Sequence, residues 1–348
     1  MTVKSVAFVC NYRCYNGAME VFRNVARVLH ARGIRTCYVY HHERPDEKYP
    51  DMSMFDRVAY VPQMIGTGVS VDRAELGASM AAVANGYDVV HHALIPLDWR
   101  FCFKNMLTRP QVETYHSIVG WRDLAWPQYQ FRIQGGVEKW PEAMTAVSRG
   151  LAERIQKDTG RPVSCVCNGV PVPKHIDYSK REYVTYAGRI SADKGLDEWL
   201  RIAVRLQESR PDLKFQWVGE LSPQYDKFAF ACLQAAAPWL EVTGFQEDLG
   251  PFYDRSAVLM HTSPAEGLPM VLIEAMMHGV PCVAYDVGDC WETGCGIMRD
   301  AAMMAVIAPT LACAGDKTRE RIARETAAKF SDTRMAEEYL AIYERLLA

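Results

Sequence analysis

The sequence lacks any long apolar run. Nowhere does it approach the roughly 18 consecutive apolar residues that a membrane-spanning helix requires. Its first ten residues, Met1–Cys10, predict a β-strand rather than a secretory signal peptide. We therefore expect a cytoplasmic protein that is at most peripheral to a membrane surface.

Two features of nucleotide-binding and nucleic-acid-binding proteins are also missing. No Gly-x-Gly-x-x-Gly follows the first predicted strand, which argues against a dinucleotide site. No Lys- and Arg-rich run occurs, and the net charge of the 348 residues is only -3, so nothing supports nucleic acid as a partner. The apolar share of 49% is that of an ordinary globular protein, and the length suggests about two domains.

Cysteine and histidine are present, but not at the spacings of metal ligands. The 11 cysteines are scattered, and Cys165-x-Cys167 has no second pair at the spacing of a zinc site. His91, His92 and His116 likewise lack a second set of spaced ligands. The sequence therefore predicts no metal site. We expect most cysteines to be reduced residues of the core, as in cytosolic proteins.

Strands alternate with helices along both halves of the chain. This order predicts an α/β fold with parallel sheets that helices cover on both faces. Strands of the first half are predicted at 6–10, 37–40, 87–92, 112–116 and 145–148, with helices over 21–29 and 149–157. Those of the second half are predicted at 183–187, 215–218, 240–243, 257–262 and 282–286, with helices around 196–203 and 332–347. Prolines and polar residues interrupt this pattern near 165–182, which predicts a domain boundary there.

Residues 263–275 are the most informative part of the chain. They place Glu266 on a predicted loop and Glu274 in a short predicted helix, which Pro269 begins and Gly279 ends. A buried strand comes before this loop, so Glu266 is expected at the carboxyl edge of a parallel sheet, where ligands bind. The two acids could contact two parts of one extended ligand. The alternative is a solvated loop acid and an acid on a helix surface.

A second loop contains two cations. Arg189 and Lys194 lie between Gly188 and Gly195, after one predicted strand and before a helix. At such a helix start, backbone N–H groups and the helix dipole add to the side-chain charge, which predicts a diphosphate site. The alternative is a pair of surface cations on a loop.

These two motifs resemble those of the retaining glycosyltransferases of family 4 (glycosyl transferases group 1), which have the GT-B fold. Glu266 and Glu274 match the spacing of the family's Glu-x7-Glu element, and residues 188–195 resemble its Gly-Arg-x4-Lys-Gly element. The resemblance implies two Rossmann-like domains whose parallel sheets face each other across a cleft. It implies an N-terminal acceptor domain of residues 1–165 plus the C-terminal helix 332–348, and a donor domain of residues 166–331.

The resemblance also implies roles for individual residues. Glu266 would contact the donor sugar and Glu274 the ribose, while Arg189 and Lys194 would hold the diphosphate. His116 resembles the family's histidine that faces the donor sugar, although a core histidine is the alternative. The expected catalytic residues are thus Glu266, His116, Arg189 and Lys194. The other expected donor-binding residues are Gly17, where the family has two adjacent glycines, and Gly188, Gly219, Gly244, Phe245, Gly267, Leu268, Pro269 and Glu274.

The resemblance implies transfer of a sugar, with retention of its anomeric configuration, from a UDP-sugar or GDP-sugar. No metal ion or other cofactor is expected, because two cations could stabilise the leaving diphosphate. The acceptor stays open among a glycan, a lipid-linked sugar, a small metabolite and a modified base. The aromatic segment 120–131 would suit sugar stacking, a lipid interface or a plain core. A nucleotide-sugar epimerase and a non-catalytic nucleotide-sugar-binding protein of the same fold are the alternatives.

Overall fold

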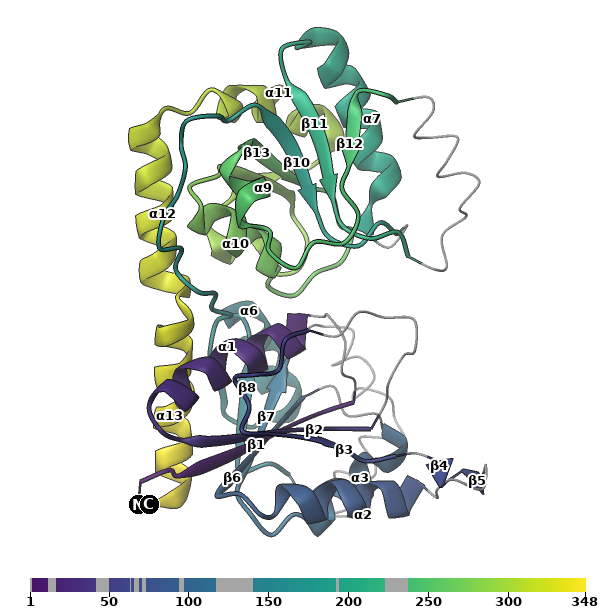
Figure 1. The fold of residues 1–348 in the computed structure, drawn as a ribbon, viewed down its shortest axis with the longest axis vertical. Coiled ribbons are helices and arrows are strands. Elements are labelled where there is room, and N and C mark those ends of the chain that lie inside the picture. Colours follow the sequence, from purple (N-terminus) through teal and green to yellow (C-terminus); the bar gives the residue numbers. More distant parts are fainter. Residues whose placement is uncertain are drawn as a thin grey trace. The chain divides into compact units, whose positions relative to one another are not determined.

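The computed structural model describes residues 2–11, 17–41, 50–62, 64–65, 69–70, 73–93, 97–116, 140–191, 194–222 and 237–348. Contacts divide the chain into two units, Met1–Pro171 with Asp332–Ala348 and Val172–Ser331. Each unit is built around one large parallel sheet (Figure 1). The prediction of two parallel α/β sheets is therefore confirmed. Within the described ranges, no helix is long and apolar enough to cross a membrane.

The main sheet of unit 1 has seven strands, each parallel to its neighbours, in the order β3-β2-β1-β6-β7-β8-β9. Its strands are β1 (Ser5–Cys10), β2 (Arg35–Tyr40), β3 (Arg57–Tyr60), β6 (Val89–Ala93), β7 (Gln111–Tyr115), β8 (Ala143–Ala146) and β9 (Val163–Cys165). A separate antiparallel pair consists of β4 (Met64–Ile65) and β5 (Val69–Ser70). The described helices of the unit are α1 (Gly17–Ala31), α2 (Arg73–Ala84), α3 (Leu97–Met106), α6 (Arg149–Thr159) and α13 (Asp332–Leu347).

Helices cover both faces of this sheet. Successive side chains of a strand point to opposite faces. Phe8 of β1 accordingly packs on Phe22 of α1, with ring centroids 5.0 Å apart, whereas its neighbours Ala7 and Val9 belong to a cluster with Met80 of α2. Figure 1 shows α1 above the sheet and α2 and α3 below it. Burial on both faces explains why β1 is apolar at nearly every position.

The C-terminal helix α13 is part of unit 1 because a buried polar network ties it to the sheet. His91 Nδ1 of β6 lies 2.6 Å from the hydroxyl of Tyr343, and His91 Nε2 lies 2.6 Å from Thr114 Oγ1 of β7. Arg27 of α1 forms an ion pair with Asp332 at 3.2 Å. His91 is fully buried, and this burial lowers its pKa well below the usual value, so the imidazole is neutral. We therefore assign His91 a structural role.

The sheet of unit 2 has six parallel strands in the order β12-β11-β10-β13-β14-β15. These are β10 (Tyr183–Ala187), β11 (Lys214–Val218), β12 (Leu240–Val242), β13 (Ser256–His261), β14 (Cys282–Tyr285) and β15 (Gly296–Met298). The described helices are α7 (Leu196–Ser209), α9 (Gly250–Asp254), α10 (Met270–Met277), α11 (Ala301–Ala312) and α12 (Asp316–Phe330), with the short 3-10 helix η2 (Cys290–Thr293).

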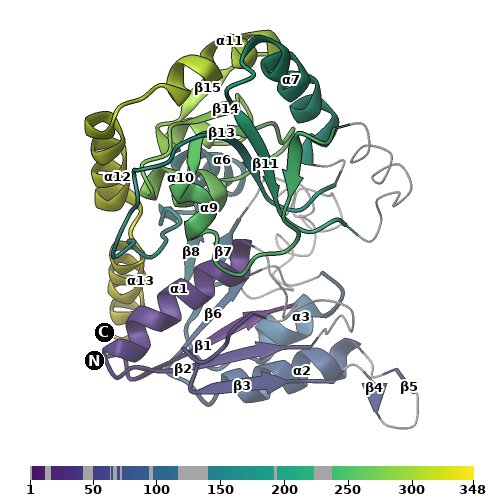
Figure 2. The ribbon, with the colours of Figure 1, turned by 45° about the horizontal axis from the view of Figure 1, so that its top comes forward.

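The core of unit 2 forms two clusters, one on each face of this sheet. Val258 and Met260 of β13 pack with α7, α11 and the indoles of Trp199 and Trp217. Leu259, which lies between them in sequence, instead packs with α10 and α9. The arrangement of these helices about the sheet can be followed in Figure 2. The alternation along one strand fixes which helices cover which face.

Candidate active site

The two sequence motifs flank the point in unit 2 where the strand order reverses. From β10 the chain continues to β11 and β12, and it then returns to β13 on the other side of β10. The segment 188–195 follows the carboxyl end of β10, and the segment 262–269 follows the carboxyl end of β13. In doubly wound sheets, ligands bind in the crevice that such a reversal opens at the carboxyl edge.

Glycine allows the loops at this edge to touch through their backbones. Gly195 has a φ of +71°, and a Cβ added there would lie 2.1 Å from the carbonyl oxygen of Thr262. Thr262 Oγ1 in turn donates a hydrogen bond to the carbonyl oxygen of Gly195 at 2.9 Å. A Cβ on Gly219 would lie 1.8 Å from the carbonyl oxygen of Gly188. The loops after β10, β11 and β13 are therefore packed so closely that larger residues do not fit.

Lys194 and Glu266 meet where the loops after β10 and β13 approach each other. Lys194 Nζ lies 2.7 Å from Glu266 Oε1, and the same oxygen lies 3.3 Å from Nε2 of His261. The side chains of Lys194 and Glu266 are 29% and 14% exposed, so the pair is only partly open to solvent. Burial by itself raises the pKa of Glu266, but His261 and Lys194 lower it to about 2. Glu266 is thus an anion at neutral pH and not a proton donor.

The loop that holds Glu266 is fixed by the segment after β14. Gly288 packs so tightly that a Cβ there would lie 2.0 Å from the carbonyl oxygen of Glu266. The backbone N–H of Asp289 donates to the carbonyl oxygen of Gly267 at 3.0 Å. Leu268 is buried, and Pro269 is the N-cap residue of α10. Glu266 therefore stands on a rigid turn, although it lies outside any helix or strand.

Glu274 lies on α10 and is held by a tyrosine. The hydroxyl of Tyr253, in α9, donates to Glu274 Oε2 at 2.8 Å. Tyr253 is completely buried, and this burial, followed by the charge of Glu274, raises the pKa of its hydroxyl well above the usual value. The phenol therefore stays protonated, and its O–H donates a hydrogen bond to the carboxylate. With about 1.5 Å of rise per residue, Glu274 lies about one turn into the helix from Met270.

The remaining donor-binding candidates of unit 2 lie on neighbouring loops. Arg189 is exposed on the loop after β10. Gly244 and Phe245 follow β12, and Gly244 forms an isolated bridge with Gly219. The structure thus brings the candidates of the second half to one edge of one sheet, and their roles stay predictions.

Gly17 and His116 belong to unit 1. Gly17 is the exposed first residue of α1, and the loop residues 12–16 before it lie outside the described residues. His116 directly follows β7, and burial lowers the pKa of its imidazole to about 4, so it is neutral at physiological pH. The predicted aromatic segment 120–131 lies outside the described residues.

Two residues of the site were not predicted from the sequence, His261 and Tyr253. His261 ends the apolar strand β13, and the sequence around it offers only the signal of a polar residue at a strand end. Tyr253 precedes β13 in a five-residue helix, and nothing in its local sequence points to Glu274. Tyr253 and Glu274 are separated by the whole of β13, whereas His261 and Glu266 are five positions apart and meet because the loop after β13 folds back.

Soft metal ligands come together at one place in unit 1. The sulfur atoms of Cys165 and Cys167 lie 3.6 Å apart on a partly exposed segment. Two thiols are fewer than the three protein ligands of a catalytic zinc site. Burial is confirmed for Cys10, Cys37 and Cys282, whereas Cys165 and Cys313 are exposed.

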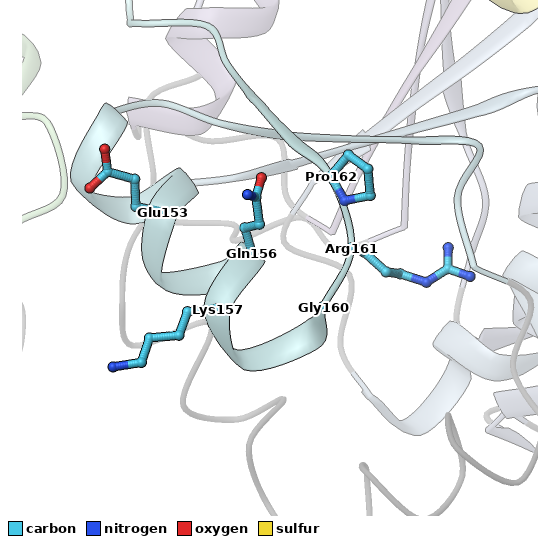
Figure 3. Close-up of a pocket in the computed structure, with 6 residues that line it drawn as sticks. All are labelled: Glu153, Gln156, Lys157, Gly160, Arg161 and Pro162. Carbon is cyan, nitrogen blue, oxygen red and sulfur yellow. The ribbon is translucent and has the colours of Figure 1, made fainter.

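A cavity of about 510 Å³ lies elsewhere in unit 1, at the end of α6. It is lined by Glu153, Gln156, Lys157, Gly160, Arg161 and Pro162. Figure 3 shows that Lys157 and Arg161 extend in opposite directions from this segment. None of the predicted site residues lines this cavity, and its charged groups do not converge on one point.

Solved glycosyltransferase structures share this fold over nearly their whole length. Anabaena HepE in complex with UDP matches with a TM-score of 0.77 and 15% identity, covering 98% of this chain and 100% of that chain. A glycosyltransferase from Rickettsia africae matches with a TM-score of 0.72 and 14% identity, covering 100% and 99%. Sucrose-phosphate synthase from Thermosynechococcus elongatus matches with a TM-score of 0.70 and 16% identity, covering 99% of both chains. These likenesses establish the fold as GT-B, as the sequence predicted.

The sequence also matches two family models. Glycosyltransferase Family 4 matches residues 15–173, and Glycosyl transferases group 1 matches residues 181–319. The chain therefore belongs to the group 1, family 4 glycosyltransferases, and the predicted family and enzyme class are confirmed. No curated protein sequence matches the chain.

Proposed function

We propose that the chain transfers a sugar from a nucleoside-diphosphate sugar, bound at the carboxyl edge of the unit 2 sheet, to an acceptor. The observation that carries this proposal is the meeting of Lys194 and Glu266 at the strand-order reversal, 2.7 Å apart. A cation and an anion at one point suit a donor whose diphosphate is bonded directly to a sugar with free hydroxyls. HepE, which shares the fold, has been solved in complex with UDP-glucose, and this supports a UDP-sugar; a GDP-sugar is the other candidate.

The diphosphate would be held by Lys194 and Arg189 and by the start of α10, rather than by the start of α7 that the sequence indicated, because the first turn of α7 contains Asp197 and Glu198. Negative charge develops on the leaving diphosphate as the bond to the sugar breaks, so fixed positive groups stabilise the transition state. The first turn of α10 contains no acidic residue, so its N–H groups and dipole are available to an anion. These groups supply the charge that a metal ion would otherwise provide, which supports a reaction without a metal or other cofactor.

The two glutamates would bind different parts of the donor. Glu266 would accept hydrogen bonds from hydroxyls of the donor sugar, and Glu274 would accept one from the ribose while Tyr253 keeps its carboxylate in place. Gly219, Gly244 and Phe245 would line the nucleotide pocket. His116 would complete the sugar site as a neutral imidazole.

We further propose that the reaction retains the anomeric configuration. In the structure Oε1 of Glu266 is engaged by Lys194 and lies beside His261, so the carboxylate does not stand free to attack the sugar. This supports attack by the acceptor on the same face that the diphosphate leaves, rather than a covalent glycosyl-enzyme. The acceptor would be a glycan, a lipid-linked sugar, a small metabolite or a modified base.

The test is a hydrolysis and transfer assay with a panel of UDP-sugars and GDP-sugars, in the presence and absence of EDTA. We expect turnover of one donor, no effect of EDTA, loss of turnover in Lys194→Ala, and a product whose anomeric configuration by NMR matches the donor. Lys214→Ala is the control, because Lys214 forms an ion pair with Glu182 at the far edge of the sheet. If no donor is turned over, or if both lysine variants behave alike, the proposal fails.

A further inference from the structure

His261 is a buried ionisable residue at the edge of the candidate site. It is the last residue of β13, where it pairs in register with Ala284 of β14. Its side chain is 3% exposed, and its ring stacks on that of Tyr186 at an interplanar angle of 14°. A strand between two others fixes the position of the backbone, so the imidazole has little freedom to move.

The carboxylate of Glu266 lies next to this imidazole. Nε2 of His261 lies 3.3 Å from Glu266 Oε1. Among the described residues, no other carboxylate lies within ion-pair distance of the ring. Neither ring nitrogen of His261 forms an aligned hydrogen bond with a described residue, although an unsatisfied buried N–H is costly, so Glu266 is the acceptor nearest to hand.

Glu266 Oε1 accepts a hydrogen bond from Lys194 and also lies close to the buried imidazole of His261, and these two groups differ in what else they can bind. Lys194 is partly exposed, and in the proposed function it binds the donor diphosphate. A diphosphate has more negative charge than a carboxylate, so it competes for the ammonium group. His261 is buried at the end of β13 and cannot follow the diphosphate.

We propose that His261 is a positioning residue that keeps Glu266 in place when the donor diphosphate draws Lys194 away. Before the donor binds, the carboxylate of Glu266 forms the ion pair with Lys194 that a phosphate of the donor would later form. Once Lys194 has turned to the diphosphate, the carboxylate aligns with the N–H of His261, and this new hydrogen bond keeps it toward the sugar hydroxyls. This inference rests on the proposed function, and it adds a residue that acts through Glu266 rather than on the substrate.

The test compares two replacements of His261. His261→Leu keeps much of the apolar volume but removes the donor to Glu266, whereas His261→Gln places an amide N–H near the position of Nε2. We expect His261→Leu to lower kcat for donor hydrolysis about 10- to 100-fold, which is the range expected for losing a hydrogen bond to a charged group. The Kd for the nucleoside diphosphate should change less than about threefold, and His261→Gln should recover most of kcat.

His278→Leu is the matched control. His278 also pairs with a carboxylate, that of Asp254 at 2.7 Å, but it follows the far end of α10. This variant should keep the wild-type kcat even if it lowers the melting temperature.

Three results would overturn the inference. The first is a His261→Leu variant as active as an active wild type. The second is a His261→Leu variant that loses kcat and nucleotide binding together, and the third is a His261→Gln variant that does not recover kcat. If His261→Leu does not fold, His261→Asn replaces it, since its shorter side chain does not reach Glu266. An inactive wild type would instead refute the proposed function, and the inference with it.

Discussion

The ammonium nitrogen of Lys194 lies 2.7 Å from Oε1 of Glu266, although 72 positions separate the two residues in the sequence. The contact joins the loops that leave two adjacent parallel strands at the reversal of strand order. It links the part of the site that would bind a diphosphate to the part that would bind a sugar.

Replacing Glu266 should separate binding from turnover. Glu266→Gln removes the charge that would stabilise the transition state on the sugar side, so we expect kcat to fall about 100-fold or more. It also releases Lys194, so the nucleoside diphosphate should bind more tightly than to the wild type. Steady-state kinetics and calorimetric titration measure the two effects. Weaker nucleotide binding with an unchanged kcat would mean that the two glutamates have each other's roles.

Replacing Glu274 should mainly weaken donor binding. Glu274→Gln removes the charged acceptor proposed for the ribose, so KM for the donor should rise about tenfold while kcat changes little. Tyr253→Phe should also raise KM, but by a smaller factor, because the carboxylate of Glu274 is kept and only its hydrogen bond from Tyr253 is lost. The same kinetic assay applies to both. A normal KM in Glu274→Gln would refute contact between Glu274 and the nucleotide.

Gly195 should not tolerate a side chain. Gly195→Ala imposes an unfavourable positive φ, which costs about 1–2 kcal/mol, and adds a clash with Thr262 that costs about 1–3 kcal/mol more. Gly294→Ala in the same unit is the control, because Gly294 has a φ of +86° but only the flexible Met276 Cε at 3.9 Å. Urea unfolding should show the larger loss for Gly195→Ala. Equal losses would mean that the loops are not packed as described.

The stability of the protein should fall in mild acid. Burial lowers the pKa of His116 from an ordinary value of 6.5 to about 4 and moves the pKa of His91 in the same direction. Between these values the unfolded chain binds more protons than the folded chain, so the free energy of unfolding decreases as pH falls from about 6.5 toward 4. Urea unfolding at pH 7.5, 6.5, 5.5 and 5.0 measures this, and His116→Asn should flatten the dependence. Stability that rises over this range would contradict neutral buried imidazoles.

Much of the fold could be predicted from sequence because parallel strands buried on both faces are apolar throughout. The predicted strand 183–187 is β10 (Tyr183–Ala187), and the predicted strand 257–262 lies within one residue of β13 (Ser256–His261). The last predicted helix, 332–347, is α13 (Asp332–Leu347). Short strands such as β3 and β9 were not predicted, because they are largely exposed and have no apolar run.

Residues of the candidate site could be predicted from the sequence only where they belong to a local motif. Glu266 and Lys194 stand in recognisable loops and Glu274 in the short helix that follows one of them, so their place at the sheet edge followed from the strand and helix order. His261 and Tyr253 act through contacts with residues beyond their own element, and such contacts depend on packing rather than on local sequence. His91, for which the sequence indicated no role, joins β6 to α13.

Calorimetric titration with nucleoside diphosphates tests the central claim most directly, that the carboxyl edge of the unit 2 sheet binds a diphosphate through Lys194. UDP and uridine, and GDP and guanosine, are titrated into the wild type, Lys194→Ala and Lys214→Ala. We predict that one diphosphate binds the wild type at least about tenfold more tightly than its nucleoside, since charge-assisted hydrogen bonds are strong. Lys194→Ala should lose most of this difference, and Lys214→Ala should keep it. Equal affinity of wild type and Lys194→Ala for the diphosphate would contradict the account.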